Sequence, residues 1–459
     1  MTYRDSLQGW GIDERYFSNW ITASSVKLSA GQLELLLKKQ SIYIEKAGYL
    51  TINAQKPSTQ QDLSFALEQI NAQHLTTYGL TGNGVKIGII DGGFLNAPKN
   101  RSLNSLFDRN RVVAYKDFIT PDLPAYAGKS NLDDQHGTDV WVMLGGYHRE
   151  KNIRYGLATD ALYYLARTDH GAGEKRIEEE YFIKALAWMH EQGVRLINTS
   201  LGYTNGYDKA SENYMPEQMD GSSAIAKATQ YAIDKKGMIV VGAAGNEGNV
   251  PWKVINTPAD ARDVIAVGAS KNTISDKMDY SSIGPSYLDY LKPELTCFSA
   301  SGTSFAAPVI TGLIACMLEL NPDLDNKTIR DILFRSSKLY PFGNNYLGYG
   351  NPDARKILQY LTEDEEITQD IKPIYIAERK SLLSMIFRRN KISGQSFRFQ
   401  PGNESVLVYH KYDSWKVIEK QLLIPEKRWL RIRRHPEATS TTVIAGNQIY
   451  ELLWQHTAQ

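Results

Sequence analysis

Short apolar segments without polar alternation restrict most strongly how this chain folds. Such runs are typical of strands covered on both faces, as in parallel sheets. Five of them, each six or seven residues long, are VKIGII (85–90), ALYYLA (161–166), VRLINTS (194–200), GMIVVGA (237–243) and VIAVGA (264–269). Segments with helical apolar spacing separate or follow them, at 137–146, 178–193, 222–237, 304–320 and 326–336. This order predicts an α/β fold, with a parallel sheet flanked by helices on both faces.

Changes in pattern along the chain predict smaller units on either side of this fold. Residues 1–60 are predicted to form a small α+β N-terminal unit, with a strand in WITASSVKLS, a helix in AGQLELLLKKQ and a strand in SIYIEKAGYLTI. Residues 61–74 are interpreted as a linker and 75–360 as the α/β domain. After the acidic stretch YLTEDEEITQD, residues 371–459 are predicted to form a small β-rich C-terminal domain, with strands in VLVYHKYDSWKVI, KRWLRIRR and STTVIAG.

The composition argues against several classes of function. The formal net charge of +1 over 459 residues gives no general attraction to nucleic acid. The basic and aromatic stretches FRRNK and RWLRIRRH are typical of nucleic-acid contacts or of solvated strand faces. We favour the second interpretation and predict no nucleic-acid partner. No apolar run approaches the ~20 residues of a membrane span, so none is predicted.

Cysteine and histidine spacing bears on metals and redox state. Cys297 and Cys316 are predicted to be buried free thiols, although one bridge between them stays open. The chain has no HExxH or CxxC pairing, so we predict no catalytic metal and no cofactor required for the chemistry.

Polar residues follow the predicted strands at the edge where active sites of parallel sheets form. Asp91, Ser200 and Asn246 follow three of the strands, and His136 and Ser304 stand at predicted helix starts. A carboxylate, an imidazole and a hydroxyl are the parts of a nucleophilic triad, because serine needs an adjacent base and that base needs an orienting acid. Each residue taken alone also fits a helix cap, a turn or a surface position. In particular, the motif SGTSFAAPVITG (301–312) makes Ser304 either a nucleophile or a helix cap.

The motifs around these residues resemble those of the subtilisin-like serine proteases, or subtilases. IGIIDGG resembles the strand that ends in the catalytic aspartate, DQHGTDVWVMLGG the HGT motif, AAGNEG the oxyanion loop and SGTSFAAPVITG the nucleophile motif. The order Asp, His, Ser is also that of subtilisin. The resemblance covers about residues 75–360.

The resemblance implies a serine endopeptidase acting on protein or peptide substrates through an acyl-enzyme. It implies that Asp91, His136 and Ser304 form the catalytic triad and that Asn246 contributes to the oxyanion hole. INTSLGY resembles the segment that pairs with the substrate backbone, which implies substrate-binding roles for Ser200, Leu201 and Gly202. Ala243, Ala244 and Gly245 are then expected to line the wall of the specificity pocket.

Three positions depart from the family pattern. Gly92 follows Asp91 where relatives usually carry Thr or Ser, so a hydroxyl that helps hold the carboxylate is missing. Thr159 replaces a proline in GLATDALYY, which otherwise resembles the family's GVAP segment. The loop at 147–155, YHREKNIRY, has three basic residues and one carboxylate. Calcium needs several oxygen ligands, so no calcium site is predicted there, while other calcium sites stay open.

The resemblance also gives expectations for the N-terminal unit and for localisation. Residues 1–60 loosely resemble the rear half of an inhibitory propeptide, which implies that this unit binds the peptidase domain; a stable subdomain without inhibitory role is the alternative. MTYRDSLQGW has no apolar signal core. A removed signal peptide implies a secreted, periplasmic or cell-surface protein, and a cytoplasmic protein is the alternative.

Two other functions compete with the peptidase. A catalytically inactive subtilase-fold scaffold is supported only by Gly92, and the complete set of motifs argues against it. An esterase of the α/β-hydrolase type requires GxSxG around the serine and the order Ser, Asp, His, and this chain has neither.

Overall fold

A computed structural model describes the fold and divides the chain into two compact units, Met1–Gln60 and Gln61–Gln459. The described residues are 14–18, 23–26, 62–128, 132–170, 175–271, 276–363, 366–367, 371, 373–376, 382–386, 405–424, 429–433, 435–446 and 448–454. In the first unit, β1 (Glu14–Ser18) pairs antiparallel with β2 (Ala23–Val26). The strand β2 lies in the segment predicted as the first strand. The predicted helix and second strand of this unit lie outside the described residues.

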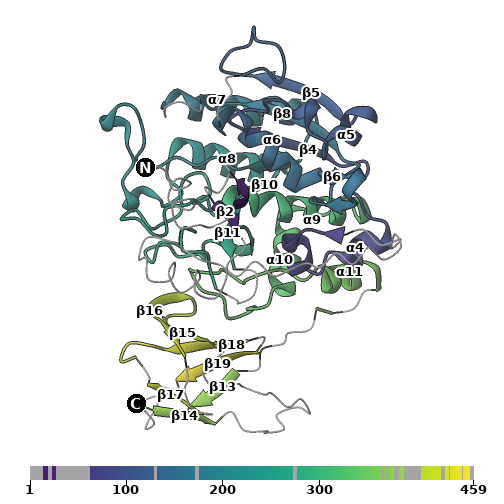
Figure 1. The fold of residues 1–459 in the computed structure, drawn as a ribbon. Helices are drawn as coiled ribbons and strands as arrows, with labels where there is room; N and C mark the ends of the chain where they lie inside the picture. Colours follow the sequence, from purple (N-terminus) through teal and green to yellow (C-terminus); the bar gives the residue numbers. More distant parts are fainter. Residues whose placement is uncertain are drawn as a thin grey trace. The chain divides into compact units, whose positions relative to one another are not determined.

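The second unit is built around a seven-stranded sheet in the order β12-β11-β10-β9-β4-β8-β5, and every neighbouring pair is parallel (Figure 1). Its strands are β4 (Lys86–Asp91), β5 (Val112–Asp117), β8 (Leu162–Arg167), β9 (Leu196–Thr199), β10 (Ile239–Ala243), β11 (Ile265–Ser270) and β12 (Leu295–Phe298). A small separate sheet consists of β3 (Asp62–Leu63), β6 (Tyr147–His148) and β7 (Ile153–Arg154).

Helices cover both faces of the large sheet. They are α3 (Phe65–Gln69), α4 (Gln73–Tyr78), α5 (Asn104–Asp108), α6 (Leu132–Gly145), α7 (Ile177–Glu191), α8 (Ala224–Lys236), α9 (Ala307–Leu320), α10 (Asn326–Ser336) and α11 (Ala354–Glu363), with 3₁₀ turns η1 (Ala97–Lys99), η2 (Arg149–Lys151), η3 (Ala210–Glu212), η4 (Pro216–Gln218) and η5 (Thr303–Phe305). In β4, Ile89 packs into the core that includes α6 and α9, while Ile90 packs into the core of α7 and α8. Successive strand residues point to opposite faces, so an apolar run fits a sheet covered twice. The predicted α/β fold is confirmed.

The segment 61–74, interpreted from sequence as a linker, carries β3, α3 and the beginning of α4. Leu67 and Ile70 are fully buried in the main core. Leu67 lies in α3 and Ile70 directly follows it, and their spacing of three residues brings both side chains to the same side of this short segment. The polar composition just before this segment obscured that pattern.

Helix α9 lies at the centre of one of these cores. The stretch Thr303–Leu320 is apolar and long enough to cross a membrane by length and composition, and 83% of it is buried inside the fold. Among the described residues it is the single such stretch. It therefore has the character of a core helix.

Cys297 and Cys316 are free and buried, so the disulfide bridge that the sequence left open is not formed. Burial raises the pKa of Cys297 and of Cys316 to about 12, because an apolar environment disfavours a thiolate.

The C-terminal region forms a β-rich domain, as predicted. Four antiparallel strands, β19-β18-β15-β16, carry β13 at one edge in parallel pairing, and β14 pairs separately with β17. The strands are β13 (Pro373–Ile376), β14 (Leu382–Ile386), β15 (Val406–Tyr412), β16 (Lys416–Leu423), β17 (Trp429–Arg433), β18 (Ser440–Ala445) and β19 (Gln448–Trp454). Strands β13, β14 and β19 were not predicted.

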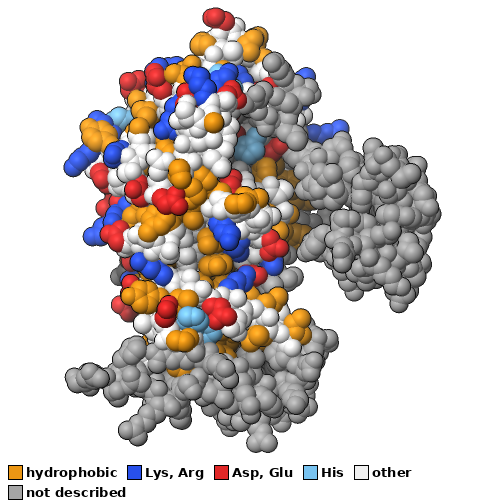
Figure 2. Space-filling model, turned by 90° about the vertical axis from the view of Figure 1, so that its left-hand side faces the viewer, with side chains coloured by type: hydrophobic (Ala, Val, Ile, Leu, Met, Phe, Trp, Pro, Cys, Tyr) orange, Lys and Arg blue, Asp and Glu red, His pale blue; other side chains and the backbone are white. Residues whose placement is uncertain are grey.

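Charged side chains of both signs are interspersed on the face shown in Figure 2, without a large field of one sign among the described residues. This distribution agrees with the near-zero net charge of the chain.

Candidate active site

Three of the predicted site residues lie at one edge of the sheet. Asp91 is the last residue of β4, which lies between β8 and β9. Ser200 directly follows β9, and Asn246 is the third residue after β10. The carboxyl ends of parallel strands open at a common edge, so the strand order alone brings these residues together.

His136 reaches this edge from α6. The sequence predicted His136 at the start of a helix. The helix begins at Leu132, so His136 lies inside it. Its Nδ1 lies 2.7 Å from Oδ1 of the fully buried Asp91. A Cβ atom at Gly137 would lie 2.5 Å from the carbonyl oxygen of Gly93 and 2.9 Å from Cβ of Asp91. The glycine after the histidine is therefore required for the helix to approach the aspartate this closely.

Charges around His136 favour its protonated form. Burial lowers the pKa of His136, but the charge of Asp91 and its hydrogen bond outweigh this effect. Asp139 and Asp169 add to the increase, so the pKa lies above its ordinary value. Burial also raises the pKa of Asp139 itself to about 7. A base with nearby carboxylates is well suited to carry a proton for part of a reaction.

Ser304 lies in η5, just before α9. Its hydroxyl donates to the carbonyl of Ser200 at 3.3 Å, and the Ser200 hydroxyl donates to the carbonyl of Ser304 at 2.8 Å. No side-chain cap is formed at either η5 or α9. Gly302 begins the turn with φ of +136°, a conformation that side chains rarely permit. The hydroxyl of Ser304 thus does not act as a helix cap.

Asn246 is oriented by the residue that precedes Ser304. Its Oδ1 accepts hydrogen bonds from the backbone N–H of Thr303 at 2.8 Å and from the Thr303 hydroxyl at 3.1 Å. A backbone N–H can only donate, so the amide oxygen must face Thr303. This arrangement leaves the Nδ2 donors of the exposed Asn246 available to another acceptor.

A cleft of about 440 Å³ joins His136, Ser304 and Asn246. The predicted substrate-binding residues that line it are Ser200, Leu201, Gly202, Ala243 and Gly245. Ala244, predicted as a pocket wall, is fully buried beneath it, and its N–H donates to the carbonyl of Val267 at 3.0 Å. The backbone at 244 thus continues the pairing of β10 with β11.

The cleft also contains side chains that the sequence reasoning missed, among them Asp169, Glu247 and Asn256. Asp169 follows the predicted strand 161–166, so the rule that singled out Asp91 could have identified it. Glu247 stands beside Asn246 in the AAGNEG motif. Asn256 has no local signal, because its place beside Gly202 depends on the tertiary fold.

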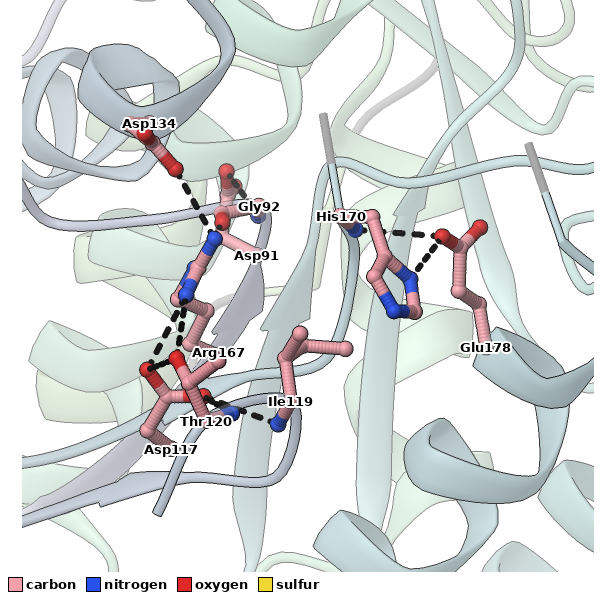
Figure 3. Close-up of polar contacts among 9 residues, drawn as sticks. All are labelled: Asp91, Gly92, Asp117, Ile119, Thr120, Asp134, Arg167, His170 and Glu178. Carbon is pink, nitrogen blue, oxygen red and sulfur yellow. Dashed lines mark hydrogen bonds and ion pairs between the residues drawn. The ribbon is translucent and has the colours of Figure 1, made fainter. Parts of the chain in front are cut away.

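The segment that carries Asp169 is held by a buried glutamate. Glu178, fully buried in α7, accepts a hydrogen bond from the backbone N–H of His170 at 3.1 Å, and its Oε1 lies 2.5 Å from Nδ1 of that histidine (Figure 3). Its other oxygen accepts from the backbone N–H of Lys175 at 3.2 Å. Asp169 therefore projects into the cleft from an anchored stretch of chain.

Within the part of the chain that the structure describes, no group of three or more His, Cys, Asp or Glu side chains is arranged to hold a metal ion.

Comparison with known proteins agrees with this geometry. The model of the Peptidase_S8 subtilase family matches residues 82–351, more than half of the chain. Subtilisin of Bacillus pumilus is 27% identical over 301 residues, which cover 63% of this chain and 96% of that protein. Subtilisin NAT of Bacillus subtilis subsp. natto is 27% identical over 300 residues, covering 63% of this chain and 70% of the relative. The Clostridium perfringens CspB protease shares the fold, with a TM-score of 0.52 at 16% identity over 64% of this chain and 98% of that chain. The chain belongs to the subtilase family and is a serine endopeptidase that acts on protein or peptide substrates.

Proposed function

We propose that Ser304, His136 and Asp91 form the catalytic triad of this endopeptidase. Ser304 Oγ attacks the carbonyl carbon of the scissile peptide bond while His136 takes its proton. His136 then gives that proton to the leaving amine, and an acyl-enzyme remains on Ser304. Water attacks the acyl-enzyme by the same route in reverse, so the serine hydroxyl is restored. No cofactor enters these steps.

Asp91 keeps His136 in the tautomer that this mechanism needs. Its carboxylate accepts the Nδ1 proton of His136, which leaves Nε2 unprotonated as the base. In the free enzyme Ser304 donates to Ser200 instead of to His136. Catalytic hydrogen bonds are often formed only in the substrate complex, and we expect the serine hydroxyl to turn toward His136 there.

The oxyanion hole in this proposal consists of Nδ2 of Asn246 and the backbone N–H of Ser304. Both would donate to the substrate oxygen as it gains negative charge. Ser200, Leu201 and Gly202 would pair with the substrate backbone, and Ala243 with Gly245 would form the wall of the pocket.

The 2.7 Å contact between Asp91 and His136, in a cleft shared with Ser304, carries this proposal. A fluorophosphonate probe tests it, with the adduct located by intact mass and peptide mapping. A single adduct on Ser304 is expected. An absence of labelling in both the full chain and the chain freed of its N-terminal unit would favour an inactive scaffold.

The N-terminal unit is proposed to act as an inhibitory propeptide and the protein to be exported. Support for the propeptide role comes from the division of the chain at Gln60, which separates Met1–Gln60 as a compact unit. Labelling that begins only after cleavage near residue 60 is the expected result for a zymogen. Equal labelling before and after cleavage would contradict inhibition.

The pH dependence of kcat/KM should report His136. The neutral imidazole is the active form, and the pKa of His136 is raised, so activity should fall as pH decreases through a midpoint above the ordinary value of ~6.5. In Asp139→Asn, loss of the negative charge that Asp139 carries above its own pKa of about 7 should move this midpoint to lower pH. The measurement is kcat/KM from pH 5 to 9 for both proteins. A flat profile would contradict the role of His136, and an unchanged midpoint would contradict the effect of Asp139.

The charge of the cleft predicts a preference among substrates. Asp169 and Glu247 line it, and no Lys or Arg lies among its described lining residues. Peptides with Lys or Arg near the scissile bond should therefore be cleaved faster than those with Glu. Asp169→Asn should reduce this preference by about 1.4- to fivefold, as expected for a partly exposed charge pair worth ~0.2–1 kcal/mol.

This preference is measured with peptides that carry Lys or Glu at successive positions, at low and high salt. Glu180→Gln is the matched control, because Glu180 is exposed on α7 and does not line the cleft. Screening should weaken the preference at high salt. Equal cleavage of Lys and Glu peptides at low salt would contradict the prediction.

A further inference from the structure

A buried arginine connects the segments that carry the proposed acid and base. Arg167 is the last residue of β8, and the register of the sheet places it beside Asp91 at the end of β4 and Asp117 at the end of β5. Its side chain is 8% exposed (Figure 3). A buried guanidinium is costly unless its charge is compensated and its N–H groups are bonded.

The guanidinium group forms four hydrogen bonds. Its Nη1 donates to Oδ2 of Asp117 at 3.0 Å and to the Thr120 hydroxyl at 3.1 Å. Its Nη2 donates to Oδ1 of Asp134 at 2.9 Å, and its Nε donates to the carbonyl of Gly92 at 2.9 Å. The two buried carboxylates of Asp117 and Asp134 thus balance the charge of Arg167. Its Nε bonds the residue that follows Asp91.

Asp117 is itself fixed as an anion. Burial raises its pKa, but hydrogen bonds from the backbone N–H of Thr120, from Arg167 and from the backbone N–H of Ile119 outweigh this effect. The pKa of Asp117 is therefore below its ordinary value. Asp117 therefore stays ionised in its ion pair with Arg167.

The contact with Gly92 matters because Asp91 has few other supports. Its Oδ1 accepts from the backbone N–H of Gly92 at 2.8 Å and contacts His136, whereas its buried Oδ2 has no partner among the described residues. A hydroxyl at position 92, absent here, is the kind of group that could serve this second oxygen. The direction of the Gly92 N–H therefore largely determines how the carboxylate is held.

The two peptide groups flanking Gly92 are both held by the end of β8. The carbonyl of Asp91 accepts from the backbone N–H of Thr168 at 3.1 Å, and the carbonyl of Gly92 accepts from Arg167. Glycine has the widest range of backbone conformations. These two hydrogen bonds restrict the backbone at Gly92, whose N–H holds the carboxylate of Asp91.

The same guanidinium also bonds the helix that carries the base, through Asp134. Asp134 stands two residues before His136 in α6, and its carbonyl accepts from the backbone N–H of Leu95 at 2.8 Å. Arg167 thus bonds the helix that carries His136 and the loop that follows Asp91 at the same time.

We infer that Arg167 is a positioning residue of the active site, which keeps Asp91 and His136 in their productive geometry in a chain that lacks a hydroxyl at position 92. This inference rests on the proposed roles of Asp91 and His136. Arg167 does not touch substrate. Its effect is on the alignment of two groups that do the chemistry, and small misplacements of such groups have large kinetic effects.

Kinetic variants separate positioning from general stabilisation. Arg167→Lys keeps the charge but cannot reach all four acceptors in one plane, and Arg167→Met removes both charge and donors. Each is expected to lower kcat about 10- to 100-fold with KM changed less than about twofold. Arg330→Lys and Arg330→Met are the controls, because Arg330 also pairs with two carboxylates, Asp263 and Glu294, but lies on α10 away from the cleft. The controls should lower the melting temperature and keep kcat.

A spectroscopic readout tests the same inference without relying on activity. In the Ser304→Ala background, the proton between His136 Nδ1 and Asp91 should give a downfield ¹H NMR resonance. We expect Arg167→Lys and Arg167→Met to shift or broaden this resonance, and the Arg330 variants to leave it unchanged. If Arg167→Met does not fold, the resonance of Arg167→Lys is compared with that of Arg330→Lys.

The outcomes distinguish the inference from the proposed function. A Ser304 that stays unlabelled both in the full chain and after cleavage near residue 60 refutes the nucleophile, while the NMR comparison still decides whether Arg167 positions the pair. If the Arg167 variants keep kcat and the resonance and lose only melting temperature, as the Arg330 variants do, Arg167 is a structural ion pair and the inference is overturned.

Discussion

Ser304→Ala is expected to abolish peptide-bond hydrolysis while leaving the fold intact. The proposed nucleophile is removed, and in subtilisin the corresponding loss is ~10⁶-fold in kcat. The hydroxyl makes one hydrogen bond, to the carbonyl of Ser200, whereas the reciprocal bond from Ser200 ends on the backbone of residue 304 and is kept. The measurement is hydrolysis of casein and of a fluorogenic peptide, together with the melting temperature.

Ser336→Ala is the matched control for this substitution. Ser336 is buried like Ser304 and donates one hydrogen bond among the described residues, to the carbonyl of Leu333, but it lies in α10 outside the cleft. Its variant should retain hydrolysis. Undiminished casein cleavage by Ser304→Ala would exclude Ser304 as the nucleophile.

Asn246→Ala has the second largest expected effect. It should lower kcat by ~10²–10³ with little change in KM, the range that loss of the corresponding donor causes in subtilisin. The donor acts on an oxygen that becomes negative only during the reaction, so substrate binding is affected less than turnover. The measurement is steady-state kinetics with one peptide substrate for the variant and the wild type.

A second substitution separates this role from loop support, because Asn246 also accepts two hydrogen bonds from Thr303. Asn246→Asp keeps an acceptor for Thr303 but removes the amide donor. Both variants should lose kcat to a similar extent if the donor stabilises the oxyanion. A large loss in Asn246→Ala with near-normal turnover in Asn246→Asp would instead assign Asn246 to positioning of the Thr303 turn.

Strands of the central sheet could be predicted where burial on both faces left a continuous apolar run, as in β4 and β10. The edge strand β5 has partly exposed positions along most of its length, and Lys292, Pro293 and Glu294 stand directly before the four residues of β12, so neither shows such a run. The helices in 61–74 were missed because five or six residues give too few turns for a periodic pattern.

Candidate site residues could be predicted where chemistry and local backbone demands coincide in one short motif. His136 is followed by Gly137 because the helix approaches Asp91 closely, and this pairing is visible in the sequence. Ala244 stays a predicted part of the pocket wall; its side chain is fully buried, while its neighbours Ala243 and Gly245 line the cleft. Asp169 was missed although it follows a predicted strand.

The sequence by itself determined the α/β architecture, the strand-end placement of Asp91 and Asn246, and the family, because these depend on periodicity and on motifs a few residues long. Only the tertiary structure decided which charged side chains form ion pairs with one another. Arg167 finds Gly92, Asp117 and Asp134 at separations of 75, 50 and 33 residues. Nothing local marks these residues as partners, since the register of three neighbouring strands and the approach of α6 bring them together in a buried site where each charge requires the others.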